Sequence, residues 1–387
     1  MKESRTNIRK VRNIALYVLL SLFVFTLVFR VLLGWPAFQT WATGQITQYI
    51  NNEYNVQVQI DAVDIDWIDQ VGLNGVYIED HQKDTLAYIG ALRVSIGELA
   101  FEGLTELGFP TVALSDGYFN LVVYEQDSLS NLNVFINRFG SSQPADTASE
   151  DLVITSNGLE LTNFRFRYEN EHAPRQEDAI DWDHLDLRQI HARLSDISMV
   201  NDTIDAHIQQ LQCIDQSGFD LKQFSGLAHF NSLQTQVKDL VIETNESYLA
   251  LQLEFNYDSL GSYSEFMEEV DMNLQLDSID LQMDDLGYFS SNLKGWSQLL
   301  RATGQARGTV DNLTLRKFNL GFGEGSNIRG NFDFNGLPNI EETFIMLNLK
   351  ELNTTAADIE SFPDFNFPLC ASRRLELPEQ INRLRNI

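Results

Sequence analysis

The chain has 387 residues, of which 43% are hydrophobic, so it could form two or three ordinary domains or one elongated architecture with a sizeable core. Its 27 basic and 55 acidic residues give a formal net charge of −28, which argues against nucleic-acid binding, because binding a polyanion normally needs a basic face. Its two cysteines, Cys213 and Cys370, exclude a disulfide-dense scaffold and a CxxC site, and the sequence does not decide whether they pair.

The N-terminus predicts a membrane anchor. Residues 14–33, IALYVLLSLFVFTLVFRVLL, are 20 predominantly apolar residues, enough at ~1.5 Å each to cross a hydrocarbon layer of ~30 Å. Five basic residues and one Glu precede them, which favours a cytoplasmic basic tail at 1–13, a transmembrane anchor at 14–34 and the bulk of the chain outside the cytoplasm. A cleaved signal peptide is the competing interpretation, but its apolar run is usually ~7 to 15 residues and no A-x-A-like site follows here.

Residues 35–55 predict an amphipathic helix that begins after Pro36. Its apolar residues recur at steps of three and four and comprise Phe38, Trp41, Ala42, Ile46, Tyr49 and Ile50. We expect this helix to lie at the membrane interface, with Phe38, Trp41 and Ile46 as its membrane-facing residues.

From Val56 onward the apolar period changes from 3.6 to 2, which predicts a mostly β chain. The stretch VQVQIDAVDIDWI alternates in two phases that slip near Ala62, as expected of half-buried strand with a turn or bulge. Later alternating segments are Leu92, Val94 and Ile96; Leu159 and Leu161; Leu249, Leu251, Leu253 and Phe255; Phe332 and Phe334; and Ile345, Leu347 and Leu349.

Two stretches with helical spacing interrupt the strands, and we expect both to pack on the core. They are Leu132, Phe135, Ile136 and Phe139, behind a capping Ser130 or Asn131, and Phe289, Leu293, Trp296 and Leu300. Residues 140–151, GSSQPADTASED, have no aromatic or large aliphatic side chain and predict a flexible loop. We therefore expect a first β-sheet segment at 56–139 and a second at 152–387.

A weak internal repeat lies within the second segment. Residues 237–256 match a segment 79 residues later, and Ser247, Leu249, Leu253, Phe255 and Asn256 align with Ser326, Ile328, Phe332, Phe334 and Asn335. Such a repeat predicts strands added repetitively, each unit contacting mainly its neighbours. Chance matching among strands is the alternative.

No motif indicates catalysis, so we expect no enzyme and no metal or cofactor. The six histidines have no metal-ligand spacing, and Asp61, Asp64 and Asp66 lie in a strand pattern without the glycine-containing loop of a calcium site. The glycines of GFGEG are not followed by a phosphate-binding lysine, and Ser291 with Lys294 forms an isolated SxxK without its companion motifs. A binding or structural function is the stronger hypothesis.

The order of elements resembles AsmA-like proteins, most closely the start of the TamB (translocation and assembly module) family. The matching features are the basic N-terminus, one apolar span, the WPAFQTW helix, the strand VQVQIDAVDI and then GLNGVYIEDHQKDTLAYIGALRVSI at residues 72–96. In that family a D, short polar turn, D-T-L element precedes an alternating strand, and here it is Asp80, Asp84, Thr85 and Leu86. The segments FDLKQFSGLAHF, VKDLVIETNESYL and FNGLPNIEETF are also similar to the family.

The resemblance implies a fold and a function. Members are anchored in the inner membrane with the bulk of the chain in the periplasm, and they form a long sheet bent into a gutter that is apolar inside and polar outside. They are taken to conduct phospholipids toward the outer membrane, and an older role is assembly of outer-membrane β-barrel proteins. The implied partners are thus phospholipid, the inner membrane and an outer-membrane barrel assembly partner. Candidate residues of the lipid groove are Val58, Ile60, Leu92, Val94, Ile96, Leu251, Leu253 and Phe255.

Two other architectures stay open. Alternation alone slightly favours a closed β-sandwich that acts as a scaffolding or adhesion ectodomain, because most alternating strands line a core. A sheet that offers its edges to unfolded barrel strands is the third alternative. Family members also continue with further strands and a C-terminal domain, whereas this chain stops in LELPEQINRLRNI, so we expect a fragment or a truncated reading frame.

Overall fold

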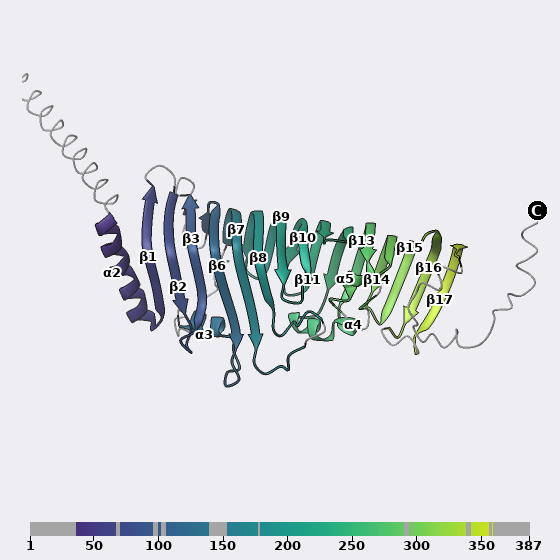
Figure 1. Ribbon diagram of the computed structural model, residues 1–387, viewed down its shortest axis with the longest axis horizontal. Helices are drawn as coiled ribbons and strands as arrows, with labels where there is room; N and C mark the ends of the chain where they lie inside the picture. The colour runs from purple at the N-terminus through teal and green to yellow at the C-terminus, as the bar shows by residue number, and fades with distance from the viewer. Residues whose placement is uncertain are drawn as a thin grey trace, which may run out of the picture.

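A computed structural model describes residues 36–66, 70–95, 100–101, 106–138, 153–176, 179–289, 294–295, 297–337, 342–355 and 358 (Figure 1). The anchor expected at 14–34 and the loop expected at 140–151 lie outside these residues. In the described part of the chain, no helix combines the length and the apolar character needed to cross a membrane. The helices are α2 (Pro36–Tyr54), α3 (Asn131–Asn137), η1 (Leu260–Glu265), α4 (Phe266–Glu269) and α5 (Met283–Leu286).

The expected mostly β fold is confirmed, and the described strands form a single sheet. Their bounds are β1 (Gln57–Asp66), β2 (Gln70–Glu79), β3 (Thr85–Ser95), β4 (Ala100–Phe101), β5 (Glu106–Phe109), β6 (Val112–Val123), β7 (Val153–Asn170), β8 (Asp186–Val200), β9 (Thr203–Asp215), β10 (Asp220–Phe230), β11 (Gln234–Glu243), β12 (Tyr248–Asn256), β13 (Asp271–Gln282), β14 (Leu299–Gly308), β15 (Asn312–Phe322), β16 (Ser326–Asn335) and β17 (Phe344–Asn353).

Consecutive strands are neighbours along most of the sheet. β1, β2, β3 and β6 pair in that order, β6 pairs with β7, and β7 to β17 follow one another. The β6–β7 pairing is parallel, as is the attachment of the short β4–β5 hairpin to β7, and the other pairings are antiparallel. Because β6 precedes and β7 follows the 140–151 stretch, the two expected β segments belong to one sheet.

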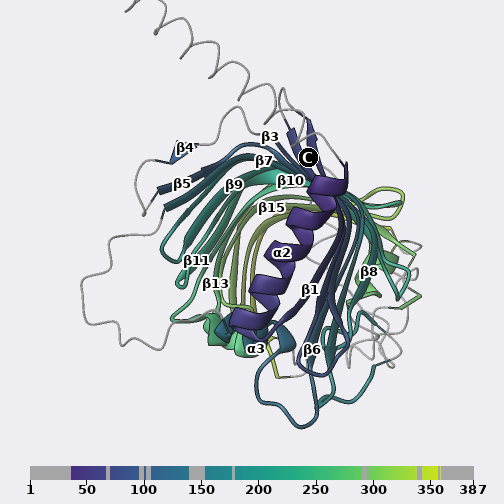
Figure 2. The same cartoon turned by 90° about the vertical axis from the view of Figure 1, so that its left-hand side faces the viewer.

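The sheet is long, open and curved (Figures 1 and 2). Viewed along its length from the β1 end, the strands bend so that the sheet has a concave and a convex side, and α2 runs across the near end (Figure 2). The expectation of an elongated, curved sheet is therefore confirmed. A closed β-sandwich is not, because the described strands supply no second sheet to cover the first.

Bulges near the middle of alternate strands explain how the sheet bends while its apolar pattern is kept. In β11 and β15, two residues oppose one residue of the next strand, between Val237 and Leu240 and between Leu315 and Phe318. The additional residue changes the phase of the apolar alternation, so side chains before and after the bulge stay on one face. Lys317, within the second bulge, has a left-handed φ of 49°.

The phase slip predicted near Ala62 is also a bend. Ile60 and Val63 are half-buried, whereas Asp61 and Ala62 between them are exposed, and β1 continues through all four residues. The paired strand β2 passes this point at Gly75, whose φ is 63°, and a Cβ there would lie 2.1 Å from an Asp61 carboxylate oxygen. The slip therefore marks a bend that β1 and β2 share, and no turn interrupts β1.

The first of the two short helices predicted from spacing forms at Asn131–Asn137. In α3, Ser130 caps the helix, and its Oγ accepts a hydrogen bond from the backbone N of Asn133 at 3.2 Å. The residue that fixes α3 is polar, since buried Asn131 accepts from the backbone N of Val122 and donates to Asp80, each at 3.0 Å. The expected apolar anchoring is only part of the attachment, and Ile136 of the predicted stripe is exposed.

The second predicted helix does not extend from Phe289 to Leu300, and Leu293 and Trp296 of its stripe lie outside the described residues. Phe289 lies in a turn after α5, and Leu300 already belongs to β14, where it pairs with Leu281 of β13. Phe289 is also exposed rather than packed on a core. Pairing with β13 overrides the local helical spacing, which four apolar residues alone specify weakly.

The internal repeat predicted in the sequence corresponds to equivalent hairpins. β11–β12 and β15–β16 carry a bulge at the same place, and the aligned serines lie at the start of the second strands, Ser247 directly before β12 and Ser326 as the first residue of β16. The Ser247 hydroxyl donates to Asp285 at 2.5 Å, and the Ser326 hydroxyl donates to Asp358 at 2.7 Å. Matching turns, bulges and side-chain bonds show that the alignment reflects structure and not chance.

Candidate functional site

An unbroken row of apolar side chains crosses the whole sheet. Directly opposed residues on neighbouring strands lie on the same face, so the row can be followed from one strand pair to the next. It contains one residue from each of the fifteen strands β1–β3 and β6–β17. Its members are Val63, Leu73, Leu92, Leu114, Leu161, Ala192, Leu211, Phe224, Ile242, Leu249, Ile279, Ala302, Leu320, Ile328 and Leu352. We call this set the apolar row and the face that carries it the inner face. At ~4.8 Å per strand the row is ~67 Å long.

Residues beside the apolar row are also apolar. On β12, Leu251 opposes Leu240 and Leu276, and Leu253 opposes Val237 and Leu274. No residue of the row carries a charge, and neither do these neighbours. The inner face thus presents hydrocarbon along its length, without the charged groups that would be costly to desolvate.

The inner face is the concave side of the sheet and is open. Near the β17 end, side chains of three strands enclose a groove of about 380 Å³ whose lining is entirely apolar: Leu315, Phe318, Leu320, Ile328, Phe332, Phe334, Ile345, Leu347, Leu349 and Leu352. Neighbouring side chains on one face converge around a groove only where the sheet curves toward that face. Most members of the apolar row are partly exposed, as expected of a face without a covering layer.

The structure places the predicted groove residues on this face in two groups. Leu92 belongs to the apolar row, Val94 opposes Val71 and Val112 beside it, and Val58 and Ile60 oppose Ile78 and Val76 at the β1 end. Leu251, Leu253 and Phe255 lie on β12, several strands away, and the row connects the two groups. Ile96 lies outside the described residues.

The two groups differ in how far they are covered. Leu251 is only 8% exposed and forms a buried cluster with Val237, Leu240 and Ile279. Phe255 packs against Phe266 of α4, with ring centroids 5.4 Å apart, so α4 folds over the inner face there. The β15–β17 groove was missed as a site, although the alternation of Ile345, Leu347 and Leu349 was recognised as strand.

The outer face is polar. Cross-strand ion pairs join Arg193 to Glu160 at 3.3 Å and Arg301 to Asp280 at 3.4 Å. Such exposed pairs contribute little to stability, typically ~0 to 1 kcal/mol each. Their main effect is to make the outer face of the sheet hydrophilic, while the inner face is apolar.

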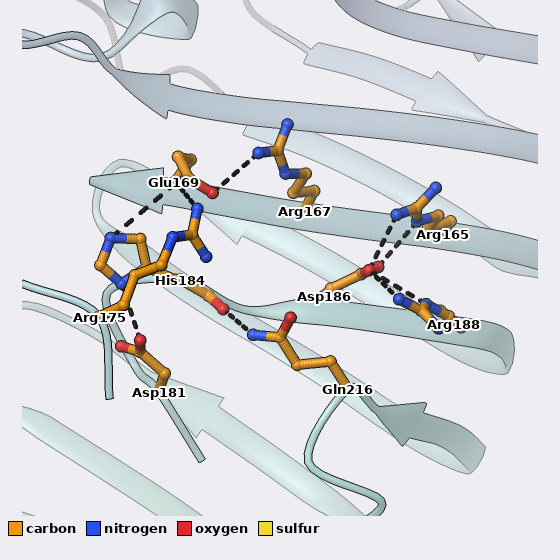
Figure 3. Close-up of polar contacts among 9 residues, drawn as sticks. All are labelled: Arg165, Arg167, Glu169, Arg175, Asp181, His184, Asp186, Arg188 and Gln216. Atoms are coloured by element: carbon orange, nitrogen blue, oxygen red, sulfur yellow. Dashed lines mark hydrogen bonds and ion pairs between the residues drawn. The ribbon is translucent and has the colours of Figure 1, made fainter. Parts of the chain in front are cut away.

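A denser polar network lies where β7 and β8 meet the connection between them (Figure 3). Arg165 holds both carboxylate oxygens of Asp186, at 2.7 and 2.8 Å, and Arg188 binds the same carboxylate at 2.5 Å. Burial alone would raise the pKa of Asp186, but the hydrogen bonds and charges of the two guanidinium groups lower it to about 2. The carboxylate therefore remains ionised and clamps the ends of β7 and β8 together.

The other half of the network is built on Glu169. This carboxylate accepts from Arg167 at 2.9 Å and from Arg175, and it lies 4.0 Å from His184 (Figure 3). The Nδ1 of His184 lies 2.8 Å from Asp181. Because these side chains bond one another, the arrangement ties the β7–β8 connection to the strands.

The helix α2 covers the free edge of β1. The Asn51 side chain donates to the carbonyl of Val58 at 2.9 Å and accepts from the backbone N of Val58 at 2.8 Å, so it replaces the bonds of a neighbouring strand. The helix predicted for residues 35–55 is confirmed, and Trp41 and Tyr49 are 60% and 64% exposed. Phe38 and Ile46 belong to the helix, but their side chains lie outside the described set.

The residues that could support covalent or metal chemistry are few. Burial, reinforced by Asp215 and Asp220, raises the pKa of Cys213 to about 11, so its thiol stays protonated and unreactive near neutral pH. Within the described ranges, no three His, Cys, Asp or Glu side chains are grouped to hold a metal ion. No protein-family model matches the chain, and no curated protein matches it in sequence. The apolar row, with its uncharged and partly exposed side chains, is the most extensive feature of the described sheet.

Proposed function

We propose that the protein carries phospholipids along the apolar row, from the inner membrane toward the outer membrane. The observation that supports this most directly is the unbroken, uncharged inner face, which is open along one side. An acyl chain gains ~0.8 kcal/mol for each CH₂ that it buries, and an open concave face lets the polar headgroup remain in water. No covalent step is needed.

In this proposal the loading end of the row lies at the inner membrane. Residues 14–34 span the bilayer, and α2 lies at its interface, where exposed Trp41 and Tyr49 contact the headgroup region. Because α2 packs against β1, it brings the first strand of the apolar row close to the lipid surface. The family resemblance and the basic N-terminal tail support the same orientation.

The test compares two substitutions on adjacent residues of β12. Leu253→Asp places a charge on the inner face at a partly exposed position, and Gln252→Asp places the same charge on the outer face as a matched control. The full-length proteins are purified in parallel, extracted with organic solvent and assayed for phospholipid per folded molecule. We expect Leu253→Asp to lose most of the lipid that the wild type and Gln252→Asp retain. Equal lipid in all three folded proteins would contradict the proposal.

A further inference from the structure

The two ends of the sheet differ in whether their outermost strand is covered. At β1, α2 lies alongside, and Asn51 bonds both backbone groups of Val58. At the other edge, β17 pairs with β16, and the described residues supply no partner for its far side. Asp358 lies at the β15–β16 turn, where it accepts from the backbone N of Glu324 at 3.0 Å. An uncovered edge of this kind is a ready template for another strand.

β17 also exposes a large apolar surface. All ten of its residues are exposed, including the inner-face residues Leu347 and Leu352, which are 54% and 53% exposed. Both line the apolar groove shared with β15 and β16. A strand added at this edge would therefore bury apolar side chains as well as satisfy the unpaired backbone groups.

The internal repeat shows what kind of strand fits. β17 corresponds residue for residue to β13, because their partners β16 and β12 are equivalent: Leu347 matches Leu274, Leu349 matches Leu276, and Leu352 matches Ile279. The register shift also falls at the same place, directly before Leu251 of β12 and directly before Gly330 of β16.

In β13, the edge that has no described partner in β17 is filled by β14. There Leu274 opposes Ala306, Leu276 opposes Gly304, and Ile279 opposes Ala302. The inward positions of the accepted strand thus hold small residues. At Gly304 a Cβ would lie 2.8 Å from the Cα of Phe318 on β15, so at this one position the following strand also restricts the side chain.

We propose that the free edge of β17 is a binding site for an antiparallel β-strand of another polypeptide, with Ala or Gly at the alternate positions that face Leu347, Leu349 and Leu352. The added strand extends the inner face by one strand, whatever cargo that face carries. Among the described residues, a second copy of this chain offers no such strand at its edges, because α2 covers β1 and because β17 presents large residues inward.

The experiment uses a synthetic peptide with the sequence of β14, LLRATGQARG, labelled with a fluorophore and titrated with the full-length protein in detergent. Binding is followed by fluorescence anisotropy. We expect saturable binding with one peptide per protein. A control peptide with the changes Ala302→Glu, Gly304→Glu and Ala306→Glu should not bind, because its inward positions are charged. Absence of binding by the β14 peptide would overturn the proposal.

Matched substitutions locate the site on β17. Leu347→Lys combined with Leu349→Lys points two charges inward and should weaken binding at least about tenfold, a change of about 1.4 kcal/mol. Met346→Lys combined with Asn348→Lys places the same charges on the outer face of the same strand and should leave the affinity within about twofold. Melting curves confirm that both variants fold.

Two other outcomes would overturn the proposal. Equal peptide binding by both double variants would mean that the peptide enters the sheet elsewhere, for example by displacing β14 from β13. A stable dimer in sedimentation that is lost in the Leu347→Lys, Leu349→Lys variant would mean that β17 is covered by a second copy and not by a strand with small inward residues.

Discussion

Two residues that face the same side of the sheet, Leu251 and Leu253, differ in how deeply they are buried. Both side chains lie on the inner face of β12. Leu251 is buried in a cluster with Val237 and Ile279, while Leu253 packs against that cluster and remains partly exposed. The inner face therefore behaves as a packed core at some positions and as an accessible surface at others.

Aspartate substitutions should separate these two positions. Leu251→Asp buries an unpaired charge and should reduce the free energy of unfolding by several kcal/mol, among the largest single-residue effects. At Leu253 the carboxylate can reach water, so Leu253→Asp should cost less than half as much. Thermal and urea unfolding followed by circular dichroism measure both. Equal losses would mean that Leu253 is as well covered as Leu251.

A second prediction at this scale concerns the pH dependence of the Asp186 clamp. The pKa of Asp186 is lowered from 3.8 to about 2 in the folded state, so its stabilisation is complete above pH ~4 and is lost as the pH falls toward ~2. Asp186→Asn should therefore destabilise the protein at pH 6, and the difference from wild type should shrink between pH 4 and 2. A difference that stays constant over that range would show that the carboxylate charge does not stabilise the fold.

The helix α2 covers the edge of β1, a role that its amphipathic pattern does not predict. Its Asn51 side chain bonds the backbone of Val58, so the helix takes the place of a strand along β1. Covering an edge with a helix is a common way to prevent unwanted strand pairing. The contact also connects the segment that follows the expected membrane anchor directly to the first strand of the sheet.

Removal of that side chain should open the β1 edge. In Asn51→Ala, the amide of Val58 loses its partner, so its hydrogen exchange should accelerate and stability should fall by ~1 kcal/mol. Asn52→Ala is the matched control, since Asn52 is exposed and neighbours Asn51 on the same helix. Hydrogen-exchange mass spectrometry of the β1 peptide measures the effect. Exchange at Val58 that is the same in both variants would contradict the capping role.

Most strands and α2 could be predicted from the sequence because each leaves a local pattern, and the alternation of Leu249 to Phe255 predicted β12. The turn or bulge predicted near Ala62 is instead a bend without a register shift between β1 and β2, and the bulges of β11 and β15 were not predicted. The openness of the sheet could not be predicted from alternation, which shows that one face is apolar but not whether protein covers it. For the same reason, the helical spacing that ends at Leu300 did not predict that Leu300 belongs to β14, because pairing of Leu300 with Leu281 depends on a distant strand.

At the scale of the whole molecule, each strand contacts mainly its two neighbours, so the sheet has no central core around which the chain is wrapped. Its length is set by the number of strands, and its width by the length of one bent strand. The protein should therefore be far from compact in solution, although its chain length would allow an ordinary globular fold.

Small-angle neutron scattering with contrast-matched detergent tests the elongated shape. A compact chain of 387 residues has a radius of gyration of about 21 Å. We expect a clearly larger value and a maximum dimension above ~70 Å, because fifteen strands alone extend over ~67 Å. A radius near 21 Å would indicate that the sheet closes on itself in solution.

Because the β11–β12 and β15–β16 hairpins are equivalent, the sheet could be shortened or lengthened by deleting or duplicating the residues between them. Joining Ser247 directly to Asn327 would delete 79 residues and four strands, yet the same serine would still precede the same kind of strand. Ile328 would take the place of Leu249 next to Ile242, so the hydrocarbon surface would remain continuous across the junction. The protein would become shorter by ~19 Å without a new core. Duplication of the same unit would lengthen it equally, so the length of the apolar row can change by whole hairpin units while its surface stays continuous.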